Sequence, residues 1–167
     1  MAGLGPRNRF SMEEREERFG DSCRDEEMRL TIDASVFVSA ARPSENRYPI
    51  SYRFLHRVKG SRIFCPTLVL AECGAAIARP TGDSLLSGRL VNLIKHFPGM
   101  TQVPLDLPLA LRAAEIAIEN RLRGTDAVYD SVAEDFEAVL FSWDAEMLER
   151  CPESVRAMSP EKWLENI

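Results

Sequence analysis

The chain has 167 residues, of which 45% are hydrophobic and 28% charged, a composition typical of one soluble globular domain. No stretch approaches the ~20 apolar residues of a membrane span, and no apolar run follows the first basic residues, so the sequence predicts a cytoplasmic protein rather than a membrane or secreted one. The net charge of −5 disfavours a protein that only binds nucleic acid, but it leaves open a nuclease whose carboxylates hold a cation.

The first 29 residues carry dense charge of both signs and few apolar side chains. Such a segment cannot bury a core of its own, so we expect residues 1–29 to be a charged extension that is either disordered or helical. The domain proper is predicted to span residues 30–167.

Short apolar segments and helical patterns alternate from residue 30 onwards. Residues 30–33 favour a strand, and the apolar spacing of residues 50–59 predicts a helix that ends at Gly60. Residues 62–65 favour a second strand. A strand, a helix and a second strand in this order are typical of α/β domains.

A helix is predicted directly after the second strand. Thr67 is expected to be its N-cap, and Pro80 is expected to end it, because proline cannot continue the hydrogen bonding of a helix interior. A further helix is predicted over residues 83–97, followed by a third strand over residues 101–105.

The longest predicted helix begins after Asp106, its N-cap, and runs through Arg123, where Gly124 ends it. Its expected apolar face contains Leu111, Ala114, Ile118 and Leu122.

The C-terminal part of the chain continues the alternation. Thr125 is predicted to cap a helix over residues 126–135, and residues 138–141 favour a buried strand. A last strand over residues 154–158 and a helix over residues 160–164 follow. Because helices separate the strands and no two-residue hairpin turn joins them, we predict an α/β fold, a three-layer α/β/α sandwich around a four- to five-stranded parallel sheet.

Four acids fall where such a sheet binds ligands, beyond the carboxyl ends of its strands. Asp33 and Asp144 follow predicted strands, and Asp126 lies in the first turn of a helix, where backbone N–H groups favour a carboxylate. Glu72 lies on a helix that is apolar nearly all round, where an unpaired charge is costly to bury. Carboxylate oxygens are the ligands that Mg²⁺ and Mn²⁺ prefer, so the set predicts a catalytic site for one of these cations.

Each acid also has an ordinary structural explanation. Asp33 and Asp144 could be helix caps, Glu72 an exposed helix residue, and Asp126 a common first-turn acid. The joint placement of the four therefore carries the prediction. The four cysteines show no C-x-x-C spacing, which disfavours a zinc site.

The segments around these acids resemble the PIN-domain ribonucleases, and within them the VapC-type toxins of prokaryotic toxin–antitoxin pairs. They read LTIDASVFVSA around Asp33, PTLVLAECGAAIAR around Glu72, RGTDAVYDSVA around Asp126 and AVLFSWDAEM around Asp144. The resemblance spans roughly residues 30–164. It implies a PIN-like fold and an endoribonuclease that hydrolyses RNA phosphodiester bonds with Mg²⁺ or Mn²⁺ held by the four acids. It also implies a cognate antitoxin and a homodimer.

The sequence departs from the family pattern at two positions beside the last acid, and residues 1–29 have no counterpart in the family's minimal domain. Ser142 stands where the family has threonine and keeps the hydroxyl group, whereas Trp143 replaces a residue that is usually smaller or polar.

Three further side chains are candidates for a supporting role around the metal ligands. Ser35 and Ser142 carry hydroxyl groups that could orient Asp33 and Asp144. Asp130 follows Asp126 by one helical turn on the same face, so it is either an outer acid of the site or an exposed residue paired with an arginine.

One region of the acidic chain is basic. Between residues 42 and 62, basic side chains and aromatic rings alternate against a single acid, Glu45. This pattern suits contact with an RNA backbone and stacking on bases, although a solvated helix face would look the same. The RNA-binding candidates are Arg42, Arg47, Arg53, Arg57 and Lys59.

Other assemblies and functions remain open from the sequence. The dimer or antitoxin surface is expected on apolar residues that flank the site, namely Val36, Phe37, Phe54 and Leu55. Alternative functions are an RNA-processing PIN nuclease without an antitoxin and a non-catalytic PIN-like module that binds another protein. A phosphatase or receiver-like protein would need a lysine after a late strand, and the lysines here are poorly placed for it.

Overall fold

The computed structural model describes residues 28–167, so the predicted charged extension over residues 1–29 lies almost entirely outside the described residues. One five-stranded sheet has the order β3-β2-β1-β4-β5, and every pairing in it is parallel, as predicted. The strands are β1 (Arg29–Ile32), β2 (Arg62–Pro66), β3 (Met100–Val103), β4 (Val139–Phe141) and β5 (Ala157–Met158).

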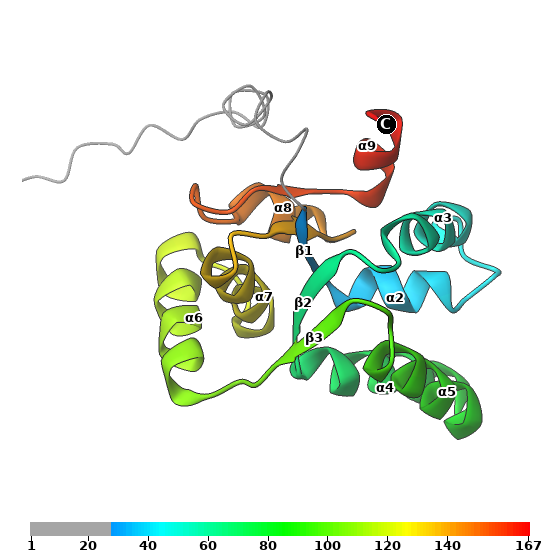
Figure 1. The fold of residues 1–167 in the computed structure, drawn as a ribbon. Helices are drawn as coiled ribbons and strands as arrows, with labels where there is room; N and C mark the ends of the chain where they lie inside the picture. Colours follow the sequence, from blue (N-terminus) through cyan, green and yellow to red (C-terminus); the bar gives the residue numbers. More distant parts are fainter. Residues whose placement is uncertain (1–27) are drawn as a thin grey trace, which may run out of the picture.

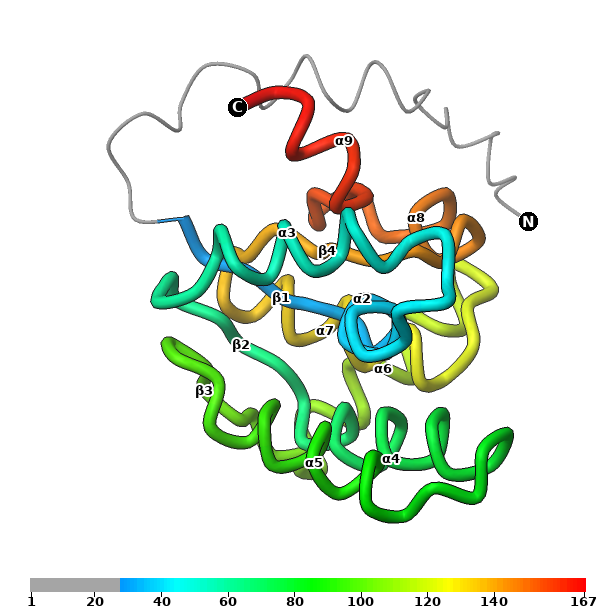
Figure 2. The backbone as a smooth tube through the Cα atoms, turned by 90° about the vertical axis from the view of Figure 1, so that its right-hand side faces the viewer, coloured from blue at the N-terminus to red at the C-terminus, as the bar shows by residue number. Residues whose placement is uncertain are grey.

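Helices cover both faces of the sheet, which confirms the predicted α/β/α sandwich. They are α2 (Ala34–Ala40), α3 (Tyr48–Val58), α4 (Leu68–Thr81), α5 (Ser84–Lys95), α6 (Leu107–Asn120), α7 (Gly124–Asp135), α8 (Ala145–Arg150) and α9 (Pro160–Glu165). Helices α6 and α7 lie on one side of the sheet, and α2, α3, α4 and α5 lie on the other (Figure 1). Figure 2 shows α4 and α5 on the β3 side of β1, and α3 with α9 on the β4 side. None of the helices in residues 28–167 is long and apolar enough to cross a membrane.

Burial on both faces explains why the central strands β1, β2 and β4 are mostly apolar. Leu30 and Ile32 of β1 are fully buried in the cluster formed with α2, α3 and α4. Phe64 of β2 points to the opposite face, where it packs with Leu109 of α6 and Val132 of α7. The central strands are therefore fixed from both sides, and their carboxyl ends form a rigid edge.

The register of β1 and β4 brings the two strand-following acids to the same place. Ile32 pairs with Phe141, and the backbone N–H of Asp33 donates to the carbonyl of Phe141 at 2.9 Å. Because both strands are parallel and end together, Asp33 and the segment from Ser142 onwards leave the sheet side by side.

The predicted C-terminal end of α4 is wrong, whereas its predicted N-cap position is confirmed. Thr67 occupies the N-cap position but makes no capping hydrogen bond with its side chain, and the helix continues through Pro80 to Thr81. Gly82 ends it with a left-handed φ of 65° and an N–H bond to the carbonyl of Ala78. Glycine reaches that conformation without a steric clash, so it terminates the helix more effectively than the proline within the last turn.

The predicted boundary between α6 and α7 is also wrong. Asp106 caps α6 as predicted, accepting from the N–H of Leu109 at 3.0 Å, but the helix ends at Asn120 rather than Arg123. Arg121 takes a left-handed φ of 56°, and Arg123, not Thr125, is the N-cap of α7. Gly124 therefore begins α7 instead of ending α6.

The buried face of α6 differs from the predicted one. Leu111 and Ile118 are 58% and 79% exposed, whereas Ala113 and Ile116 are buried against α7. Apolar residues occur on two faces of this helix, so its periodicity alone could not select the face that meets the sheet.

Candidate active site

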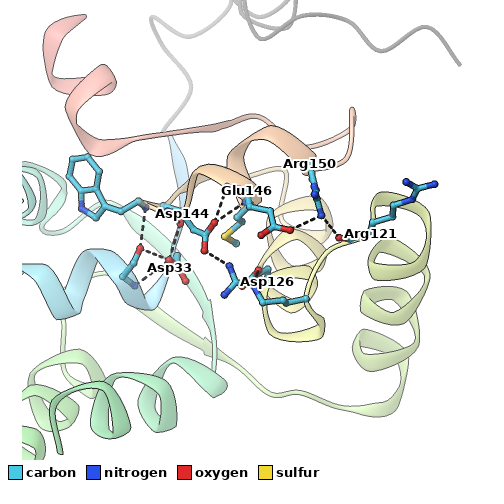
Figure 3. A network of polar contacts seen from close by, with 11 residues as sticks. Asp33, Arg121, Asp126, Asp144, Glu146 and Arg150 are labelled. Atoms are coloured by element: carbon cyan, nitrogen blue, oxygen red, sulfur yellow. Dashed lines mark hydrogen bonds and ion pairs between the residues drawn. The ribbon is translucent and has the colours of Figure 1, made fainter. Parts of the chain in front are cut away.

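All four predicted acids line one open cavity of about 740 Å³ at the carboxyl edge of the sheet. Asp33 follows β1 and Asp144 follows β4, while Glu72 projects from α4 and Asp126 from the first turn of α7. Figure 3 shows Asp33, Asp144 and Asp126 from close by. The structure thus brings together residues that are more than 100 positions apart in the chain.

Hydroxyl groups hold the carboxylate of Asp33, which is only 8% exposed. Its Oδ2 accepts from the backbone N–H of Ser35 at 3.2 Å, from the hydroxyl of Ser35, and from the hydroxyl of Ser142 at 2.9 Å. Asp33 is also the N-cap of α2, so the capping and site explanations are compatible for this residue. These bonds fix one oxygen of the carboxylate and leave the other for a ligand.

Ser142 connects Asp33 to Asp144. While its hydroxyl donates to Asp33, its oxygen accepts from the backbone N–H of Asp144 at 3.0 Å. Asp144 in turn caps α8, because its Oδ1 accepts from the N–H groups of Glu146 at 2.9 Å and Met147 at 3.1 Å. The two acids are therefore held relative to each other by a fully buried serine.

Trp143, the departure from the family pattern, packs into the protein rather than into the cavity. It is 9% exposed, and its Nε1 donates to Ser51 Oγ of α3 at 2.8 Å. Its backbone N–H donates to Ser35 Oγ at 3.1 Å. Trp143 thus attaches the turn that carries Asp144 to α3 through its side chain and to α2 through its backbone.

Glu72 is held from the opposite side of the site by Tyr129 of α7, whose hydroxyl donates to Glu72 Oε2. Burial raises the pKa of Glu72 above its ordinary value, and the charges of Asp33 and Asp126 raise it further, while the bond from Tyr129 works in the opposite direction. The carboxylate is accordingly a group that gains from a nearby cation.

Asp126 and Asp144 share one cation within the chain, the guanidinium of Arg123. Arg123 Nε lies 3.0 Å from Asp126 Oδ2, and its Nη2 donates to Asp144 Oδ2. Burial raises the pKa of Asp126 despite this contact. Burial also raises the pKa of Asp144. The hydrogen bond from the backbone N–H of Met147 and the charge of Arg123 outweigh burial, so the pKa of Asp144 lies below its ordinary value.

Asp130 is buried on α7, which rules out the exposed role that the sequence left open. It is 0% exposed, and neither carboxylate oxygen has a hydrogen-bond partner among residues 28–167. Burial raises its pKa to about 8, with further repulsion from Asp126, Glu134 and Asp33. A protonated Asp130 therefore lies beneath the site at neutral pH.

The donor set fits a hard divalent cation, because the cavity offers carboxylate oxygens. Asp126 Oδ2 is buried and accepts no hydrogen bond, although Arg123 Nε forms an ion pair with it at 3.0 Å. The side chains are not already gathered around a common point: within residues 28–167, no three His, Cys, Asp or Glu groups stand in a metal-binding arrangement. Arg123 stands between two of the acids, and Tyr129 holds a third.

The five basic candidates lie around α3 and do not form one surface. Arg42 pairs with Glu45, and the guanidinium of Arg47 lies 5.0 Å from the ring centre of Trp143. Arg53 and Arg57 line a separate hollow of about 590 Å³ with Tyr52 and His56, and Lys59 lines another. Of the five, Arg47 is tied by contact to the turn that carries Asp144.

Three residues of the site were missed from the sequence. Arg79 lines the acid cavity, Arg123 bridges two acids, and Tyr129 holds Glu72. The spacing of each along the chain could have indicated that it lies near an acid. Arg79 follows Glu72 by seven residues, and Arg123 and Tyr129 stand three residues before and after Asp126, spacings that place side chains on one face of a helix.

The predicted dimer or antitoxin surface is wrong. The residues expected on it are all in the core, with exposures of 9% or less: Val36, Phe37, Phe54 and Leu55. The exposed large apolar residues lie elsewhere among the described helices, including Leu107, Leu111 and Ile118 on α6 and Leu85 and Leu93 on α5.

The structure is thus an α/β domain with an acid-lined cavity at the carboxyl edge of a parallel sheet. Residues 30–152 match the family model of the PIN domain, and the chain belongs to the PIN domain family. This membership supports a nuclease. No curated protein matches the chain.

Solved structures similar to this chain include VapC proteins. VapC20 of Mycobacterium tuberculosis, described as a toxin that cleaves the sarcin–ricin loop, has a TM-score of 0.61 and 16% identity, and the match covers 71% of this chain and 92% of that one. PAE2754 of Pyrobaculum aerophilum has a TM-score of 0.62 and 22% identity, with 83% and 94% covered. VapBC2 of Rickettsia felis, bound to a DNA fragment from its promoter, has a TM-score of 0.61 and 15% identity, with 79% and 98% covered. At these identities the likeness shows the fold.

Proposed function

We propose that this protein is a divalent-metal-dependent endoribonuclease, and that it is the toxin of a VapBC-type toxin–antitoxin pair. The single observation that carries the proposal is the gathering of Asp33, Glu72, Asp126 and Asp144 around one cavity in a PIN domain. Four helix caps or surface acids with unrelated structural roles would not need to face the same hollow.

The four acids would hold Mg²⁺ or Mn²⁺. The cation would supply a nucleophilic water at neutral pH and would offset the charge that develops on the phosphate. The protein would contribute the fixed positions of the ligands: Ser35 and Ser142 hold Asp33, Tyr129 holds Glu72, and the N-terminus of α8 holds Asp144. Hydrogen bonds of this kind keep carboxylates oriented for a metal and are as important to such a site as the ligands themselves.

The proposed substrate is an RNA strand that crosses the cavity. Arg79 lines the cavity and is exposed, so it can contact a phosphate there. Arg47, stacked on Trp143, would extend this contact toward α3. The exposed ring of Tyr52, with Arg53 and Arg57 nearby, offers stacking and charge further along α3. Arg42 and Lys59 complete the proposed basic set around the same helix.

The proposed protein partners are a cognate antitoxin and a second copy of the chain. Two of the similar structures are toxin–antitoxin complexes, from Klebsiella pneumoniae and Salmonella typhimurium, which supports an antitoxin for this chain as well. The groove between α3 and α5, about 670 Å³ in volume and lined by Leu90, Leu93 and Phe97, is suited to an apolar segment of such a partner. Leu107, Leu111 and Ile118, exposed along one face of α6, support a homodimer.

A nuclease that processes RNA without an antitoxin would use the same acids and would differ only in its partners. A non-catalytic PIN module is disfavoured, because buried and mutually repelling carboxylates such as Glu72 and Asp126 destabilise a protein that does not use them. An adjacent small reading frame in the genome separates the two nuclease proposals.

Cleavage of single-stranded RNA tests the proposal. The purified protein should cleave RNA with Mn²⁺ or Mg²⁺, and EDTA should abolish the cleavage. Asp33→Asn should fold normally, since an amide oxygen can still accept from Ser35 and Ser142, but it should lose most activity. Asp83→Asn is the matched control, because Asp83 is also an N-cap whose side chain accepts a backbone N–H, in helix α5 away from the site. Full cleavage by Asp33→Asn would overturn the proposed site.

A further inference from the structure

Arg123 forms a bridge between two acids that come from different helices. Its Nε lies 3.0 Å from Asp126 Oδ2, and its Nη2 donates to Asp144 Oδ2. Asp144 Oδ1 already accepts two backbone N–H groups of α8. Oδ2 is therefore the oxygen that Asp144 has left for a cation, and the guanidinium occupies it.

The backbone around Arg123 is built to place this side chain. Arg121 adopts a left-handed φ of 56°, which turns the chain sharply between α6 and α7. Arg150 of α8 donates to the carbonyl of Arg121 at 2.8 Å and pairs with Glu146 at 2.6 Å, so the turn is attached to the helix that Asp144 caps (Figure 3). The guanidinium is thus directed to the gap between Asp126 and Asp144 by contacts on both sides.

On the basis of the proposed function, we propose that Arg123 is an internal cation that competes with the divalent metal for Asp126 and Asp144. A metal ion that uses Asp144 needs the Oδ2 atom that Arg123 contacts, because Oδ1 caps α8, so the guanidinium has to leave that oxygen when the metal binds. Arg123 thereby sets the metal concentration at which the site fills.

The arginine is free to be displaced by a stronger cation. Its side chain is 59% exposed, whereas that of Asp126 is 13% exposed. Ion pairs with one solvent-exposed partner are weak, and a dication attracts the same carboxylates with twice the charge. Loss of the arginine should therefore leave the fold intact, remove the competition and leave Asp126 and Asp144 to repel each other until a metal binds.

Two opposite effects follow for Arg123→Gln. The affinity for Mn²⁺ should increase about three- to tenfold, which is the scale of one or two weak ion pairs. In EDTA the variant should melt at a lower temperature than wild type, because the repulsion between Asp126 and Asp144 is then uncompensated. Arg123→Lys keeps the charge but not the two-point contact, so its affinity should fall between wild type and Arg123→Gln.

Arg79→Gln is the matched control. Arg79 lines the same cavity, is exposed, and pairs with none of these acids within the described residues. Its replacement removes the same charge from the same surroundings without breaking the bridge. A general change in electrostatic potential would therefore affect both variants alike, whereas displacement of a competitor would affect Arg123→Gln alone.

The experiment titrates Mn²⁺ into the full-length proteins, stripped with EDTA and dialysed, and follows heat and melting temperature rather than RNA cleavage. We expect Arg123→Gln to bind Mn²⁺ more tightly than Arg79→Gln does. We also expect Arg123→Gln to melt at a lower temperature than wild type in EDTA. Equal or weaker binding by Arg123→Gln, while wild type still binds Mn²⁺, would overturn the competition and leave the metal site standing. Absence of any Mn²⁺ response in wild type would overturn the proposed function together with this inference.

Discussion

Replacement of Asp130 by Asn tests how a buried carboxylate without a partner affects stability. Asp130 is 0% exposed, and neither oxygen accepts a hydrogen bond from residues 28–167. Burial raises its pKa to about 8, compared with about 3.9 in an unfolded chain. The folded protein therefore binds this proton more tightly than the unfolded protein does.

The sign of the pH dependence follows from this difference. The contribution of Asp130 to stability is greatest below pH ~4, falls as the unfolded chain loses the proton, and becomes constant above about pH 8. Each pH unit in this window corresponds to ~1.4 kcal/mol. Between pH 5 and 7.5, wild type should lose up to roughly 3 kcal/mol of unfolding free energy that Asp130→Asn keeps. The buried amide of Asn has its own unsatisfied groups, but their cost of ~1–3 kcal/mol does not vary with pH.

Urea denaturation in EDTA at several pH values between 5 and 8.5 measures the effect. The difference in unfolding free energy between Asp130→Asn and wild type should move steadily in favour of the variant up to about pH 8. Asp135→Asn, the same change at an exposed position at the end of α7, should follow the wild-type curve. A difference that stays constant over the whole range would refute the reasoning, because it would mean that Asp130 is ionised and paired in the folded protein.

Of three further predictions, two concern contacts around the site and one concerns the proposed dimer surface. Tyr129→Phe removes the bond that lowers the pKa of Glu72, so calorimetry should show a larger loss of Mn²⁺ affinity at pH 6 than at pH 8; an equal loss at both values would contradict this. Ser142→Ala breaks its bonds with Asp33 and Asp144 and should cost ~1–3 kcal/mol in urea denaturation, whereas Ser142→Thr should keep most of the stability. Ile118→Glu, at a side chain that is 79% exposed, should convert the proposed homodimer to a folded monomer in light scattering; an unchanged dimer would place the interface elsewhere.

Most of the architecture could be predicted from apolar patterning. The strands that contain Ile32 and Phe141 are short apolar runs with helices between them, and only a parallel sheet covered on both faces accommodates that order. The positions of Asp33 and Asp144 at one edge then followed, since both come directly after neighbouring strands. The metal and the RNA substrate stay predictions.

Helix ends and helix faces were less predictable, because several local signals competed. Pro80 suggested the end of α4, but Gly82 two residues later ends it. In α6, Leu111 and Ile118 suggested one buried face, while Ala113 and Ile116 occupy the face that is buried. Ala113 is a small residue on the buried face, and a hydrophobicity pattern that favours large side chains does not single it out.

The sequence by itself determined the sheet, the order of its elements and the four acids at its carboxyl edge, because alternation of apolar segments is a property of neighbouring residues. Only the tertiary structure decided which partners those acids have from other segments of the chain. Arg123 meets Asp144 because the α6–α7 turn lies against α8, and Asp130 loses contact with water because α7 is enclosed by α6 and the sheet. Burial and ion pairing depend on distances between segments far apart in the chain, and no local pattern of residues encodes those distances.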